Sequence, residues 1–296
     1  MTNLSSHQTN TSLGYMQVIL AALLWGTYGL FVRALDYSPE FIMFFRFFFG
    51  FLGLLAFTAA RRDYSWVKPV KDNWKLLIIP SVLSCVSWLC YTYAINLTSV
   101  ANAAFLIYTA PVFVVIFTPL LLREKLELTT IVALFISLLG TAALVGYSGL
   151  IGNVSSIRGD LIALFGGMTY GLFVIYLKKM PLGVLGLPSS IMVAAIVALG
   201  MLPFALSQLG LLKLEGFLIL LALGLVQQTL GTTLYHFGLN KIKAQHAGIL
   251  SYLEPLSATL LAILFLAEGF TLGTVTGGLL IVGGGIIIVT RGGSQN

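Results

Sequence analysis

Long apolar segments, separated by short polar breaks, occupy nearly all of this 296-residue chain. Each segment is close to the length of about 20 residues that an α-helix needs to cross the hydrocarbon core of a bilayer. The pattern predicts ten spans, at residues 15–34, 39–60, 75–96, 100–121, 128–147, 160–178, 188–208, 216–238, 244–266 and 272–290. Nine or eleven spans are the alternatives, because the breaks at 96–100 and 241–244 are only a few residues long.

The composition excludes other fold classes. The apolar residues AVILMFWYC make up 58% of the chain and charged residues only 9%. A typical soluble domain has about 45–50% apolar residues and roughly 25% charged residues. A β-barrel is excluded because its strands alternate apolar and polar positions over about 10 residues, and the runs here are continuously apolar. We therefore expect an all-α membrane protein.

The basic residues predict the orientation of the spans. With the N-terminus inside, the inside loops carry 12 of the 16 Lys and Arg, and the outside loops carry Arg33, Arg158 and Lys213. The inside residues are Arg61, Arg62, Lys68, Lys71, Lys75, Arg123, Lys125, Lys178, Lys179, Lys241, Lys243 and Arg291. Because loops rich in Lys and Arg stay in the cytoplasm, both termini are predicted to be cytoplasmic. The net charge of +6 is explained in this way without a nucleic-acid partner.

An internal repeat divides the chain. The sequence YGLFV at residues 28–32 recurs at residues 170–174, and a constant offset of 144 relates further polar positions. These pairs include Tyr91 with Tyr235, Asn96 with Asn240, Tyr108 with Tyr252, Pro111 with Pro255, and Glu124 with Glu268. Five helices in each copy make the second copy enter the membrane from the opposite side, an inverted-topology repeat typical of secondary transporters.

The repeat predicts the domain organisation. A cytoplasmic tail at 1–14 is followed by a first five-helix repeat at 15–147, an external connection at 148–159, a second five-helix repeat at 160–290 and a cytoplasmic tail at 291–296. Residues 1–13 contain no basic segment or cleavage site typical of a signal peptide, so we expect the first span to direct the chain to the membrane.

Several motifs resemble the EamA-type transporters of the drug/metabolite transporter superfamily. They are Trp25-Gly26, Arg46, residues 94–104, Leu253-Glu254-Pro255 and Ala267-Glu268, in an order and spacing that cover about residues 15 to 290. The resemblance implies ten helices with cytoplasmic termini, a central cavity between spans one to four and six to nine, and peripheral spans five and ten. It also implies transport of amino acids, amines or other small metabolites without a cofactor.

Two ionisable residues lie deep within predicted spans, where charge is costly and usually functional. Glu254 in span nine is the candidate for cation recognition and for proton coupling, and its counterpart in the first repeat is Ala110. Arg46 in span two lies among phenylalanines, and its guanidinium suits a substrate carboxylate. The alternatives are an ion pair between the two, a structural role for Glu254 at the Pro255 break, and extension of Arg46 toward the membrane surface.

Polar and aromatic residues inside the spans complete the predicted substrate-binding site. Gln228, Thr232 and Tyr235 share one helical face of span eight, with hydrogen bonding between helices as the alternative. His236 is expected to be a solvated residue near the cytoplasmic end, and His236 with His246 lacks a third metal ligand. The predicted aromatic lining residues, for which ordinary packing is the alternative, are Trp25, Tyr28, Trp88, Tyr91, Tyr108 and Tyr252.

Small-residue motifs predict close helix packing without fixing the oligomeric state. They are Gly167-x-x-x-Gly171 and Gly273-x-x-x-Gly277, and such motifs pack helices equally within one chain and between chains. A monomer and a homodimer both remain open.

The sequence as a whole predicts an inner-membrane secondary transporter that exports small amino acids, amines or related metabolites by alternating access. The expected partners are the small-molecule substrate and the bilayer. No phosphate-binding loop, nucleophile elbow or metal-ligand cluster is evident, so we expect no cofactor and no enzymatic activity. The alternatives are an uncoupled permease, a nucleotide-sugar or sugar-phosphate carrier, a lipid-acting membrane enzyme and a sensor without flux.

Overall fold

The computed structural model describes residues 2–98, 100–146, 157–181, 183–266, 269 and 271–291. Within these residues, ten helices are long and apolar enough to cross a membrane, which confirms the predicted count. The protein is an all-α membrane protein built from two inverted five-helix repeats. Ala267 and Glu268 of the last motif, and most of the connection predicted at 148–159, lie outside the described residues.

The first repeat supplies five spans. Span one comprises α1 (Thr2–Trp25) and α2 (Tyr28–Arg33), and spans two and three are α3 (Pro39–Ala60) and α4 (Val67–Ile95). Span four is divided into α5 (Val100–Ile107), α6 (Ala110–Phe117) and η1 (Thr118–Leu122), and span five is α7 (Leu128–Val145).

The second repeat supplies the other five. Spans six and seven are α9 (Ile157–Lys178) and α10 (Leu187–Leu206), followed by the short turn η2 (Leu209–Leu211). Span eight comprises α11 (Leu214–Leu223), η3 (Gly224–Thr232) and α12 (Thr233–Leu239). Span nine comprises α13 (Ala244–Leu250) and α14 (Leu253–Leu266), and span ten is α15 (Leu272–Arg291).

A boundary also differs at span three, where α4 begins at Val67 rather than at residue 75. Its first turns carry Lys68, Lys71 and Lys75. Because these residues are charged, a search for apolar segments does not include this part of the helix. The helix is kinked at Asn73, whose backbone is non-helical and whose side-chain amide donates to the Pro69 carbonyl at 3.0 Å.

Three spans are broken near their middle. Span one breaks at Gly26 and Thr27, span four at Tyr108 and Thr109, and span nine at Ser251 and Tyr252. In spans four and nine a proline follows in the first turn of the next helix, Pro111 and Pro255 respectively. A proline has no N–H to continue the helical hydrogen bonds of the preceding turn. Spans four and nine are counterparts, so each repeat contains an equivalent break.

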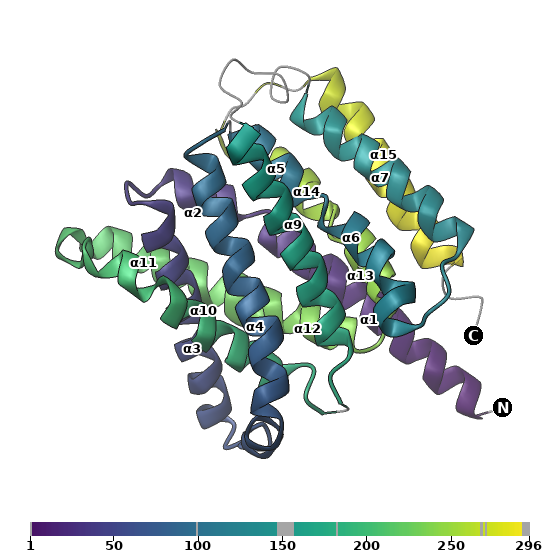
Figure 1. Ribbon diagram of the computed structural model, residues 1–296, viewed down its shortest axis with the longest axis horizontal. Coiled ribbons are helices and arrows are strands. Elements are labelled where there is room, and N and C mark those ends of the chain that lie inside the picture. Colours follow the sequence, from purple (N-terminus) through teal and green to yellow (C-terminus); the bar gives the residue numbers. More distant parts are fainter. Residues whose placement is uncertain are drawn as a thin grey trace.

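Helices from the two repeats pack against each other in symmetry-related pairs. α4 packs on α9 as α1 packs on α12, while α3 packs on α10 and α7 on α15. Each pairing maps onto itself or onto another pairing when every span is exchanged for its counterpart five spans away. The α7–α15 pair lies along one edge of the bundle (Figure 1).

Glycines bring the paired helices into close contact. A Cβ atom at Gly277 on α15 would lie 2.6 Å from the Gly140 carbonyl oxygen on α7, and one at Gly273 would lie 2.6 Å from that of Ala143. On α9, a Cβ atom at Gly167 would lie 2.9 Å from the Leu106 carbonyl oxygen. Both small-residue motifs therefore pack helices within one chain.

We expect Gly277→Ala to lower the free energy of unfolding by about 1–3 kcal/mol, because its methyl group must push α15 away from α7. Gly283→Ala on the same helix is the matched control, since nothing lies within 4 Å of a Cβ atom there. Alanine is the better helix former by roughly 0.5–1 kcal/mol, so the control should be neutral or stabilising. Thermal unfolding of the detergent-solubilised protein measures the stability of both variants. Equal unfolding midpoints for Gly277→Ala and Gly283→Ala would contradict the close contact between α15 and α7.

Candidate functional site

A central cavity lies between the two repeats. Its lining residues come from spans one to four and six to nine and, within the described part of the chain, none comes from α7 or α15. This is the arrangement that the family resemblance implied. All eleven residues predicted from the sequence line this one cavity, namely Trp25, Tyr28, Arg46, Trp88, Tyr91, Tyr108, Gln228, Thr232, Tyr235, Tyr252 and Glu254.

Arg46 is held among aromatic rings. Its side chain on α3 is 4% exposed, and its guanidinium carbon lies 4.8 Å from the centre of the Trp88 ring, 5.3 Å from that of Tyr28 and 5.5 Å from that of Phe47. At these distances the ring faces attract the cation. Its buried Nε atom has no hydrogen-bond partner. Arg46 therefore faces the cavity and does not extend toward the membrane surface.

Glu254 lies in the first turn of α14, immediately after the break in span nine. Its backbone N–H donates to the Ser251 carbonyl at 3.0 Å, and its carboxyl group has the Tyr108 hydroxyl as a hydrogen-bond partner. A carboxylate is favoured at this end of a helix by the helix dipole. The Glu254 side chain itself faces the cavity.

Arg46 and Glu254 do not satisfy each other directly. The ion pairs among the described residues do not include one between these two side chains, although each lies within the electrostatic influence of the other. The alternative in which the two charges form a closed pair is therefore wrong in this conformation. One positive and one negative group line the same cavity without direct contact.

Span eight contains a π-helical segment, η3, where the cavity is lined. Such segments are rare and are frequent at functional sites. The Gln227 side-chain amide donates to the Leu24 carbonyl at 2.6 Å and to the Thr27 hydroxyl at 2.7 Å, while the Trp25 indole donates to the Gln227 carbonyl at 3.2 Å. Gln227 thus caps the broken end of α1. Hydrogen bonding between helices, the alternative given for span eight, is therefore observed at Gln227.

The neighbouring Gln228 has a different environment. It lines the cavity, and its amide oxygen accepts from the Thr232 hydroxyl at 3.1 Å. Its amide nitrogen is buried without a partner.

His236 corrects the sequence prediction. Instead of being solvated, it is completely buried and lines the cavity. Its Nδ1 atom lies 2.9 Å from the Ser189 hydroxyl and 3.0 Å from that of Ser190, both near the start of α10. The position of a histidine along its own span gave no sign of these partners, which belong to another helix.

Other lining residues were not included in the predicted site. They include Ser84 and Ser87 on α4, and Tyr170 and Phe173 on α9. Tyr170 is the repeat counterpart of Tyr28, so the repeat contained the information needed to include it. The serines had no comparable indication in the sequence.

The cavity lining is more exposed toward one face of the bundle than toward the other. We call the end with residues 34–38 and 207–213 the Ser38 face, and the end with residues 61–66, 123–127 and 240–243 the basic face. Lining residues nearer the Ser38 face, such as Tyr28, Trp88 and Tyr91, are half-buried. Tyr235 and Tyr252, nearer the basic face, are 1% and 0% exposed.

The two adjacent glutamines allow a direct test of these assignments. We expect Gln227→Leu to lower the free energy of unfolding by about 1–3 kcal/mol, because the Trp25 carbonyl at the end of α1 loses the Gln227 amide as its donor. Gln228→Leu leaves no backbone group without a partner and should change stability much less. Thermal unfolding of the two variants measures the difference, and an equal loss in both would contradict the capping role of Gln227.

Comparison with known proteins agrees with this architecture. Two stretches, residues 12–146 and 157–290, match the EamA-like transporter family. A solved crystal structure, described only as that of a protein, has the same fold with a TM-score of 0.78 at 19% identity, over 95% of this chain and 99% of the other.

Similar sequences carry transporter names. An uncharacterized transporter of Archaeoglobus fulgidus is 28% identical over 93% of this chain and 95% of its own length. The uncharacterized inner membrane transporter YicL of Salmonella typhimurium is 29% identical over 94% of this chain and 96% of its own length. Because the family pattern matches both repeats, this chain is a multi-pass membrane transporter that belongs to the EamA-like transporter family.

Proposed function

We propose that this protein is a secondary transporter of small amino acids and related amines, which bind in the central cavity. The observation that carries the proposal is that Arg46 and Glu254 line the same cavity without forming an ion pair. Charges inside a membrane protein are costly and require compensation. An amino acid supplies a carboxylate for the guanidinium and an ammonium group for the carboxylate.

The aromatic and polar walls suit the remainder of such a substrate. Trp88 and Tyr28 fix the guanidinium from the sides, and Tyr91, Tyr108, Tyr235 and Tyr252 offer ring faces to an apolar side chain or an ammonium group. Trp25 from the first repeat, and Gln228 and Thr232 from the second, complete the lining. Together with Arg46 and Glu254, these residues make up the proposed binding site.

Alternating access is the proposed mechanism. Secondary transporters with inverted repeats place substrates near the bilayer midplane, beside broken helices, and rock one half against the other. The breaks at Tyr108 and Tyr252 flank the cavity, and Glu254 follows the second break. In the proposed cycle, Glu254 carries a proton when substrate is absent. An uncoupled permease is the alternative if Glu254 recognises only the ammonium group.

Orientation and direction follow from the basic residues. The basic face is proposed to be cytoplasmic, with both termini on that side, and the membrane to be the inner membrane, as named for the Salmonella relative. The cavity then faces outward in this conformation, as expected after export of substrate. The two proposed domains are the five-helix repeats, and the chain is proposed to act as a monomer or homodimer without a cofactor.

Two other functions have less support. A sugar-phosphate or nucleotide-sugar carrier would need several basic side chains around the phosphate, and Arg46 is the one Lys or Arg among the described lining residues. A lipid-acting enzyme would need paired acids or an activated nucleophile, and Glu254 is the one acid among them.

We expect Arg46→Gln to raise the KM for an amino acid by roughly 10- to 100-fold, since a hydrogen bond to a charged group contributes about 1.5–3 kcal/mol. The KM for the amine lacking the carboxylate should change far less. Glu254→Gln should abolish the stimulation of substrate uptake by a pH gradient. Uptake of labelled amino acids and amines into proteoliposomes measures both effects, with exposed Glu215→Gln on α11 as the control. Equal effects of Arg46→Gln on both substrates would contradict the carboxylate contact.

The orientation has its own test. We expect alkaline phosphatase fused after Arg291 to be inactive and a fluorescent protein fused there to fluoresce, because this end of α15 lies on the proposed cytoplasmic side. The opposite pair of results would place the basic face outside the cell.

A further inference from the structure

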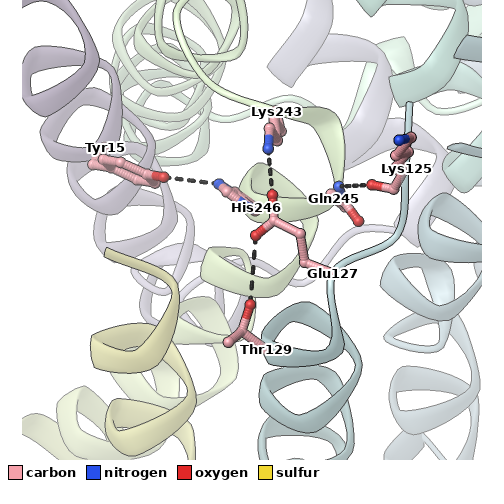
Figure 2. A network of polar contacts seen from close by, with 7 residues as sticks. All are labelled: Tyr15, Lys125, Glu127, Thr129, Lys243, Gln245 and His246. Atoms are coloured by element: carbon pink, nitrogen blue, oxygen red, sulfur yellow. Dashed lines mark hydrogen bonds and ion pairs between the residues drawn. The ribbon is translucent and has the colours of Figure 1, made fainter. Parts of the chain in front are cut away.

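Polar contacts link the two repeats at the basic face (Figure 2). Glu127, immediately before α7, forms an ion pair with Lys243, immediately before α13. The Tyr15 hydroxyl on α1 lies 2.8 Å from the Nδ1 atom of His246 on α13. The Gln245 side-chain amide donates to the Lys125 carbonyl at 3.4 Å. These contacts hold α13 against both the start of span one and the loop between spans four and five.

The short helix α13 separates two cavities. Gly248, on the side of α13 nearer the break, lines the central cavity together with Ser251. His246, two residues earlier, lines a second cavity at the basic face together with Tyr15 and Glu124. His246, which lines the cavity at the basic face, and Gly248, which lines the central cavity, are therefore only two residues apart in the chain.

Buried polar atoms without partners are found on both sides of α13. Toward the central cavity they are the Tyr252 hydroxyl and Nε2 of His236, and toward the basic face Nε2 of His246 and one carboxyl oxygen of Glu124. A buried polar atom without a partner is unfavourable and is uncommon in folded proteins. Polar residues within membrane spans usually face water-filled paths. These atoms would gain water or substrate as partners if the two cavities were joined.

We propose that α13 is the gate of the transport path at the basic face, and that the contacts Glu127–Lys243 and Tyr15–His246 are the latch that keeps it closed. When the latch opens, α13 separates from α1 and from the loop before α7, and the two cavities become continuous. The polar atoms on either side of α13 then line the path. This proposal rests on the proposed function, because it assumes that the protein opens alternately to the two faces.

The latch is suited to repeated opening. Its two charges are partly accessible, with Lys243 28% and Glu127 14% exposed at the side chain, so water can solvate both when they separate. Both charged residues lie in the loops before helices rather than within the bilayer core. Where α13 meets span four, Gly248 faces Pro111, and a Cβ atom there would lie 3.5 Å away. Gly248 has no side chain that would have to leave Pro111 when the gate opens.

Thiol labelling tests the gate without a substrate. A reporter cysteine at Ser251, with Cys85 and Cys90 replaced by alanine, is labelled with a membrane-impermeant maleimide in inverted and in right-side-out membrane vesicles. Glu127→Gln and Lys243→Met should each raise the labelling rate from the basic face by about five-fold or more and lower the rate from the Ser38 face. The double charge swap E127K/K243E should return both rates to within about two-fold of the parent.

Two further variants keep the test decisive. Lys179→Met removes an exposed charge at the same face and should leave both rates unchanged. Tyr15→Phe removes the bond to His246 without changing the ring and should shift the rates in the same direction as Glu127→Gln. If a latch variant fails to fold, shown by loss of labelling from both faces, Tyr15→Phe decides the outcome.

Unchanged labelling rates in a folded latch variant would overturn the proposal. So would single substitutions that raise the labelling rate from the basic face if the double charge swap does not return that rate to the parent value. Because no substrate is present, failure of the amino-acid assignment leaves this result intact. Conversely, normal transport of amino acids combined with unchanged labelling would overturn only the latch.

Discussion

The structure depends on the requirement that every backbone polar group inside a bilayer finds a partner within the protein. A broken helix exposes carbonyl and N–H groups, so it is tolerated only where another side chain or helix satisfies them. Gln227 does this for span one by donating to the Trp25 carbonyl, and the first turn of α14 does it for Ser251. These breaks make room for the cavity between the repeats.

The two repeats provide symmetric helix packing and an asymmetric site. The breaks at Tyr108 and Tyr252 are equivalent, as are the packing pairs α4–α9 and α1–α12. The charged groups are not equivalent, because Ala110 stands where the second repeat has Glu254. Duplication therefore explains the shape of the cavity, while single substitutions in one copy explain its chemistry.

Much of the fold could be predicted from the sequence because a bilayer requires long apolar helices, and the repeat gives their count and direction. The gathering of Arg46, Glu254 and the aromatic residues in one cavity followed from the same pattern. The burial of His236 and the capping role of Gln227 could not be predicted, because both depend on partners in other helices. The start of α4 at Val67 was hidden for the opposite reason, since its first turns are charged and lie outside the apolar run.

If the protein carries amino acids as proposed, the separation of one guanidinium and one carboxyl group within the cavity also sets how membrane voltage would act on transport. A zwitterion placed between them brings no net charge, so moving it across the bilayer does no electrical work. A proton carried on Glu254 adds one elementary charge, and moving that charge corresponds to about 2.3 kcal/mol for every 100 mV. In such a cycle the voltage would act directly on the proton and would reach the cargo only through the coupling.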